Sequence, residues 1–152
     1  MFLAISELKT DLYEYQIKQI IEEDESIALS AINAGIEECK SYFTPNNQIA
    51  WLDGRLRYNA DAIFAATGDD RNPLVLAYTK DIALYHLVQL NNTDVLWDSI
   101  KEKYDRAIAY LKRIQKGEVS ISSLPLLELS EEEESNDIQA FRMGSRKKFN
   151  HE

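Results

Sequence analysis

The strongest constraint on the fold is a segment from Leu74 to Leu90 that carries apolar side chains on nearly every helical face. Asn72-Pro73 stands directly before it. This pair is typical of a helix N-terminus, with Asn as the N-cap and Pro at the first helical position. A helix that is apolar nearly all round must be buried on most sides. The sequence therefore predicts a central helix over residues 74–90, which Asn91-Asn92 ends.

Two flanking segments have the three- and four-residue apolar spacing of amphipathic helices. The first covers about residues 25–42 and contains Gly35, a residue type that often marks the close approach of another helix. The second begins near residue 93 and should end at Gly117, because glycine readily adopts the left-handed conformation that stops a helix. Its apolar stripe consists of Trp97, Ile100, Tyr104, Ala107, Ile108, Leu111 and Ile114.

Shorter elements are expected between and beyond these helices. Ser6 can cap a helix near the N-terminus, and the residues that follow predict one kinked helix or two short ones. Residues 44–72 form a long connection, in which Asn59 can cap a short helix over residues 60–66. After Gly117, apolar and polar residues alternate through residues 119–121, which predicts a short extended piece.

The predicted fold class is therefore all-α: a small helical bundle of about four to five helices, with a long loop and an extended C-terminal tail. The scarcity of Gly (5) and Pro (3) favours long helices over a turn-rich β fold. Residues 1–124 are the helical domain, and Pro125 should end the folded part. Residues 125–152 form the tail, with an acidic run at Glu131–Glu134 and a basic, apolar end. Two interpretations of this tail stay open: it is simply solvated, or it orders on a partner.

The sequence contains no pattern that indicates catalysis, so we expect no enzyme, no cofactor and no metal site. It lacks a glycine-rich phosphate loop, a nucleophile elbow and any Cys/His metal spacing. The adjacent carboxylates at 22/23, 37/38 and 69/70 are interpreted as solvated faces, because neighbouring helix residues do not face each other. His86 is interpreted as a hydrogen-bonded core or interface residue, and Cys39 as a small core side chain.

Charge and hydropathy exclude several classes of partner. A net charge of -9 makes the chain a poor ligand for nucleic acid, because phosphate binding needs clustered Lys and Arg. There is no run of 18 or more apolar residues, so no membrane span is expected. We therefore expect the chain to remain in the cytoplasm of the cell that makes it.

Aromatic residues suggest where the chain contacts other proteins. Trp97 and Tyr104 are expected to pack in the core rather than to line a ligand pocket. For Trp51 and Tyr58 in the long loop, core packing and a protein contact both stay open. Aromatic and Arg side chains are enriched at the centres of interfaces. The candidate contact residues of the loop are Trp51, Arg55, Arg57 and Tyr58.

Three blocks of the chain resemble a known family. Lys80–Leu87 (KDIALYHL), and Glu102–Leu111 (EKYDRAIAYL) running on to Lys116–Ile121 (KGEVSI), are similar to two helices of Mu-like phage neck proteins. Upstream, Ala31-Ile32 with residues 41–43 (SYF) is similar to another of their helices. Together these blocks cover about residues 25–124. The chain departs from the family in the long insertion before Arg57-Tyr58 and in its charged tail.

The resemblance implies a structural protein of the virion: a head–tail adaptor that forms a ring beneath the portal protein and joins it to the tail. The implied location is the virion neck, after synthesis in the bacterial cytoplasm. The implied partners are the portal, neighbouring copies in the ring, and other neck or tail proteins. Two alternatives remain, a head-closure or tail-completion protein and an unrelated small helical protein-binding module. The expected portal-binding residues of the tail are Ile138, Phe141, Arg142, Met143, Arg146, Lys147, Lys148 and Phe149.

Overall fold

A computed structural model describes residues 1–10, 17, 25–44, 56–89 and 97–128 of the chain. Within these residues the fold is all-α, as predicted. Its main elements are the α-helices α2 (Glu25–Ser41), α3 (Ala60–Ala65), α4 (Pro73–Gln89) and α5 (Trp97–Gln115). Two short 3-10 helices, η1 (Ile5–Thr10) and η2 (Gly68–Asp70), complete the described set. No helix among them is both long enough and apolar enough to cross a membrane.

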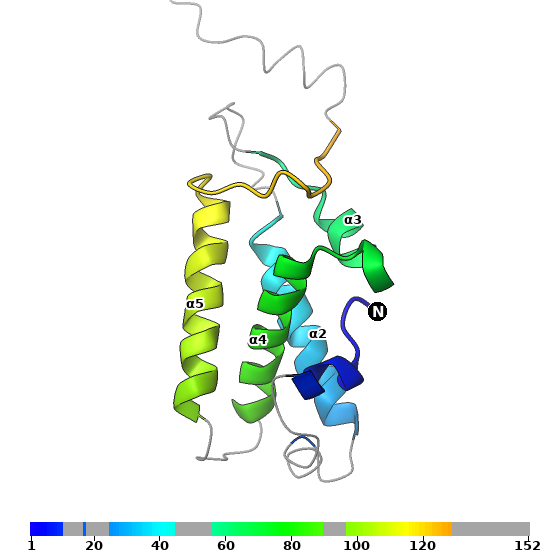
Figure 1. The fold of residues 1–152 in the computed structure, drawn as a ribbon, viewed down its shortest axis with the longest axis vertical. Coiled ribbons are helices and arrows are strands. Elements are labelled where there is room, and N and C mark those ends of the chain that lie inside the picture. The colour runs from blue at the N-terminus through cyan, green and yellow to red at the C-terminus, as the bar shows by residue number, and fades with distance from the viewer. Residues whose placement is uncertain (11–16, 18–24, 45–55, 90–96, 129–152) are drawn as a thin grey trace, which may run out of the picture.

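The three long helices lie side by side, with α4 between α2 and α5 (Figure 1). The chain direction alternates from α2 to α4 to α5, so neighbouring helices are antiparallel (Figure 1). The central position of α4 confirms the prediction made from its apolar residues. Its buried residues come from most of the helix circumference: Val75, Thr79, Ile82, Ala83, Leu84, Leu87 and Val88.

The contact between α2 and α4 is closest at Gly35. A Cβ atom built at this residue would lie 2.8 Å from both the backbone nitrogen and the Cα of Ala83. Two helices can approach this closely only where one has no side chain. The glycine that the sequence marked as a possible contact point is therefore the point where the backbones of the two helices meet.

The helix ends follow the expected local chemistry. Asn72 caps α4, because its Oδ1 accepts hydrogen bonds from the backbone N–H groups of Leu74 and Val75. Asn59 caps α3 in the same way through Ala62. Gly117 ends α5 with a φ of 76°. Its N–H donates to the carbonyl of Ile114, and the next N–H donates to that of Arg113, which is the Schellman arrangement.

Beyond α5, residues 118–127 form a strap that crosses the end of the bundle toward α3 (Figure 1). The expected extended piece at 119–121 is not a strand. Instead, an isolated antiparallel bridge pairs Tyr58 with Leu126. The N–H of Asn59 donates to the carbonyl of Pro125, and the N–H of Leu127 donates to that of Arg57. Ordered packing thus continues past the boundary expected at residue 124, because these backbone groups find partners in the 57–59 segment.

The N-terminal prediction needs a correction. Ser6 does not cap a helix, because η1 already begins at Ile5. The side chain of Glu7 reaches back to accept a hydrogen bond from the backbone N–H of Ala4. Phe2, Leu3 and Leu8 are buried in the core beside α2 and α4. The rest of the predicted N-terminal helices, at 11–16 and 18–24, lies outside the described residues.

Candidate functional site

The most concentrated group of chemically active side chains joins all three long helices. Glu38 on α2 contacts His86 on α4 through Oε2 and Nε2, which are 2.6 Å apart. Its other carboxylate oxygen, Oε1, accepts a hydrogen bond of 2.7 Å from the hydroxyl of Tyr104 on α5. We call these three residues the polar triad. A single carboxylate on α2 therefore links this helix to both α4 and α5.

The environment of the triad is half-buried. The side chains of Glu38 and His86 are 24% and 27% exposed. Burial, followed by the hydrogen bond to Glu38, raises the pKa of the Tyr104 hydroxyl well above its usual value. The phenol therefore stays protonated and remains a donor to the carboxylate across the physiological pH range.

One residue of the triad, Glu38, differs from what the sequence predicted. His86 is hydrogen-bonded at a helix interface, as expected. Glu38 is not on a solvated face, whereas its neighbour Glu37 is exposed. Adjacent helix residues point in directions about 100° apart, so one carboxylate of the pair can turn inward while the other faces water. The apolar positions Gly35 and Cys39 mark the buried side of α2, but no local pattern pairs Glu38 with residues 48 and 66 positions away.

Aromatic rings surround the triad. The ring of Tyr85 stacks on that of Tyr104 with 3.9 Å between centroids, and Trp97 lies 5.4 Å from Tyr85. Trp97 and Tyr104 pack against the core, as predicted, and both stay half-buried. A partly exposed group of large aromatic rings is typical of protein-contact surfaces as well as of bundle edges.

The described residues contain no group of three His, Cys, Asp or Glu side chains that could hold a metal ion. Cys39 is fully buried, and burial raises the pKa of its thiol to about 12. A thiol that stays protonated is a poor nucleophile, which agrees with its prediction as a small core side chain. The polar triad has its acceptor oxygens filled by its own donors, so its evident role is to hold α2, α4 and α5 together.

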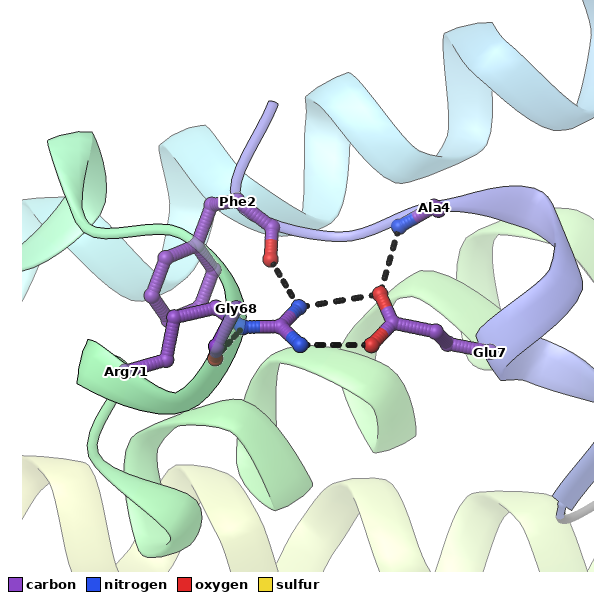
Figure 2. Close-up of polar contacts among 5 residues, drawn as sticks. All are labelled: Phe2, Ala4, Glu7, Gly68 and Arg71. Atoms are coloured by element: carbon purple, nitrogen blue, oxygen red, sulfur yellow. Dashed lines mark hydrogen bonds and ion pairs between the residues drawn. The ribbon is translucent and has the colours of Figure 1, made fainter.

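A second polar cluster fixes the N-terminus to the segment before α4. Arg71 forms a bidentate ion pair with Glu7 (Figure 2). The two N–O distances are 2.9 and 2.7 Å. The same guanidinium donates to the backbone carbonyls of Phe2 and Gly68 (Figure 2). The hydrogen bond from Arg71 lowers the pKa of the Glu7 carboxyl to about 2. No local sequence pattern indicates this pair, since its members are 64 positions apart.

Comparison of the chain with family models, curated proteins and solved structures found no match. A proposal about function therefore depends on the residues themselves.

The predicted contact residues of the long loop are only partly described. Tyr58 is 4% exposed, and its ring packs edge-on against Phe43. Its hydroxyl accepts a hydrogen bond from the N–H of Ile121. Of the two interpretations left open for Tyr58, core packing is correct, and its assignment as an exposed contact residue is wrong. Arg57 is half-buried beside the strap. Trp51 and Arg55 lie outside the described residues.

The eight residues predicted for the tail also lie outside the described part of the chain. The strap that leads to them is described through residue 128, and its last backbone hydrogen bond is the one from Leu127 to Arg57. Any partner contact of the tail would therefore begin from a fixed point on the bundle.

One open cleft of about 350 Å³ lies between α4 and α5. Its apolar lining comes from the first turns of α4, and its charged lining comes from both helices. The lining residues are Pro73, Leu76, Ala77, Lys80, Asp81, Lys103 and Arg106. The individual sequence patterns of α4 and α5 did not predict this cleft, because it depends on how the two helices face each other.

Proposed function

We propose that this protein is a head–tail adaptor in the neck of a tailed phage, where it forms a ring beneath the portal and joins it to the tail. The observation that carries the proposal is the block Glu102–Ile121, which resembles the C-terminal helix and helix end of Mu-like neck proteins. A tyrosine, a glycine and an isoleucine of this block each have a defined structural role in the fold. Tyr104 binds Glu38, Gly117 ends α5, and the N–H of Ile121 binds Tyr58.

The arrangement of the blocks also supports the proposal. The second resembling block, Lys80–Leu87, lies in the central helix α4 beside α5. Both blocks thus belong to one packed unit rather than to separate surface segments. A short helical bundle with a strap leading into a charged tail suits an adaptor, because the bundle supplies a rigid body and the tail supplies reach.

The partners in this proposal are the portal protein, neighbouring copies and other neck or tail proteins. The tail residues from Ile138 to Phe149 combine apolar anchors with basic side chains. Such a segment is suited to docking on an acidic, grooved surface, for example by adding a strand to the edge of a sheet. The proposed site of the protein is therefore the virion neck.

The test is to locate the protein in phage particles from the host that encodes it. Antibody-gold labelling of purified virions should place the protein at the head–tail junction, and deletion of its gene should leave filled heads and separate tails. A reconstruction of the junction would then distinguish an adaptor that touches the portal from a head-closure or tail-completion protein that does not. Particles that lack the protein would contradict the proposal and favour an unrelated helical binding module.

A further inference from the structure

We propose that the strap is a conformational switch, which opens as one unit while α2, α4 and α5 stay packed. In the closed state, residues 118–127 run from the end of α5 toward α3 (Figure 1). The chain therefore leaves the bundle at residue 128, beside the segment 57–59. In the open state it leaves from the end of α5 instead. The switch thus sets the side of the bundle from which residues 129–152 begin, and it does not depend on the adaptor proposal.

The strap buries little apolar surface. All of residues 118–127 are described, and Leu124 alone among them is buried, with 5% of its surface exposed. Val119, Ile121 and Leu127 are half-buried. The helix α5, by contrast, buries apolar side chains along most of its length. A segment with so few buried side chains belongs to the low-stability part of a protein, which opens locally without global unfolding.

Hydrogen bonds supply the rest of the attachment. The N–H of Ile121 donates to the hydroxyl of Tyr58, and the side-chain amide of Asn72 donates to the hydroxyl of Ser123. Two backbone hydrogen bonds attach the last residues of the strap to the segment 57–59. Each such bond contributes modestly to stability, because water replaces the lost partner when the strap opens.

Opening leaves the helix ends intact, because the two capping asparagines bind the strap through other groups. Asn72 caps α4 through Oδ1 and binds Ser123 through Nδ2. Asn59 caps α3 through Oδ1 and binds Pro125 through its backbone N–H. At the other end of the strap, the turn that stops α5 closes within residues 113–118. Loss of the strap contacts therefore leaves the ends of α3, α4 and α5 in place.

Native-state hydrogen exchange on the full chain measures the opening. The marker amides are those of Asn59, Ile121 and Leu127, since each loses its acceptor when the strap opens. The reference is the amide of Ile82, a fully buried residue of α4. We expect the three markers to share one opening equilibrium. The open form that they report should be at least about tenfold more populated than the form that exposes Ile82.

A substitution in the bundle distinguishes strap opening from global unfolding. Leu87 is fully buried in the last turn of α4, which the antiparallel packing places away from the strap (Figure 1). Leu87→Ala destabilises the closed and open forms equally, because the bundle is packed in both. It should raise the exchange rate of Ile82 by about thirtyfold or more and leave the markers unchanged. The matched substitution Leu124→Ala removes a contact of the closed form alone, so it should raise all four rates by about tenfold or more.

A cross-link supplies the reverse test. Arg57 and Leu127 are opposite residues next to the antiparallel bridge, and a backbone hydrogen bond joins them. Such residues lie about 5.5 Å apart at Cα, which is within the range of a disulfide. Oxidation of Arg57→Cys/Leu127→Cys should slow the exchange of Asn59 and Ile121 by about tenfold or more relative to the reduced form. The single variant Leu127→Cys should show no change under the same treatment.

Two kinds of result would overturn the inference. If Leu87→Ala accelerates the markers as much as it accelerates Ile82, the strap opens only together with the whole bundle. If the markers have unequal opening equilibria, or if the cross-link leaves their exchange unchanged, each hydrogen bond breaks on its own and the strap does not move as a unit.

Discussion

Replacement of Gly35 by Ala tests how closely α2 and α4 are packed. The added methyl group would lie 2.8 Å from two backbone atoms of Ala83 and 2.9 Å from its Cβ. Carbon atoms in contact prefer separations of about 3.5–4.0 Å, so the helices must move apart by several tenths of an ångström. Because two of the three clashing atoms are backbone, no rotation of a side chain relieves the contact.

Two opposing terms set the size of the effect. Ala is more favourable than Gly in a helix by about 1 kcal/mol. Overpacking a well-packed core costs about 1–3 kcal/mol, and a clash with backbone belongs at the upper end of that range. The variant should therefore lose about 2 kcal/mol of unfolding free energy. For a domain of this size, that corresponds to a fall in Tm of about 4–8 °C.

Urea unfolding followed by circular dichroism measures the change, together with Ala34→Gly as a control. Ala34 is the exposed neighbour of Gly35 in α2, so its replacement reports helix propensity alone and should cost about 1 kcal/mol. The two substitutions change helix propensity in opposite directions but should both destabilise. An increase in stability for Gly35→Ala would show that α2 and α4 are not in backbone contact, and the reasoning would fail.

Four further outcomes are expected. Glu38→Gln should lower the free energy of unfolding by about 1–3 kcal/mol, because it weakens two hydrogen bonds to a charged acceptor. The control Glu37→Gln, at an exposed position, should change that free energy by less than about 0.5 kcal/mol. Equal effects of the two substitutions would contradict the role of the polar triad. The pKa of Glu7 falls from 4.5 to about 2 in the folded chain, so its contribution to stability is complete above about pH 4.5 and is lost as the pH falls toward 2. Glu7→Gln should flatten this part of the stability–pH curve, and an unchanged curve would mean that the Arg71 pair is absent in solution. Leu111→Ala, at a fully buried position, should cost about 2–5 kcal/mol, and a loss well below 1 kcal/mol would place α5 outside the core. Deletion of residues 128–152 should leave Tm nearly unchanged and abolish neck assembly, and particles that assemble normally with the truncated chain would rule out the tail as the portal contact.

The sequence predicted the long helices well because their signals are local. Apolar residues on nearly every face identify α4, and an Asn-Pro pair identifies its start. A glycine identifies the end of α5. Each of these acts within a few residues of the helix it defines. The same holds for Asn59, whose side chain caps a helix that begins at the next residue.

The interactions that shape the candidate sites are not local, and the sequence alone did not reveal them. By its sequence context Glu38 is indistinguishable from a surface carboxylate. Only helix packing places His86 and Tyr104 beside it. Tyr58 lies in a loop by its sequence context, yet the strap folds back over it and donates the N–H of Ile121 to its hydroxyl. The cleft between α4 and α5 is a property of two helix faces, so no single stretch of sequence contains it.

The pairing of the strap with residues 57–59 has a mechanical consequence for a protein that is pulled by its tail. A force applied beyond residue 128 first reaches the hydrogen bond from Leu127 to the carbonyl of Arg57, and then the bond between Asn59 and Pro125. These two bonds, and those of Ser123 with Asn72 and of Ile121 with Tyr58, must break before the load reaches Gly117 and the last turn of α5. Under such a force the strap should therefore detach from the bundle first. Its detachment lengthens the connection to the tail, while α2, α4 and α5 keep their packing.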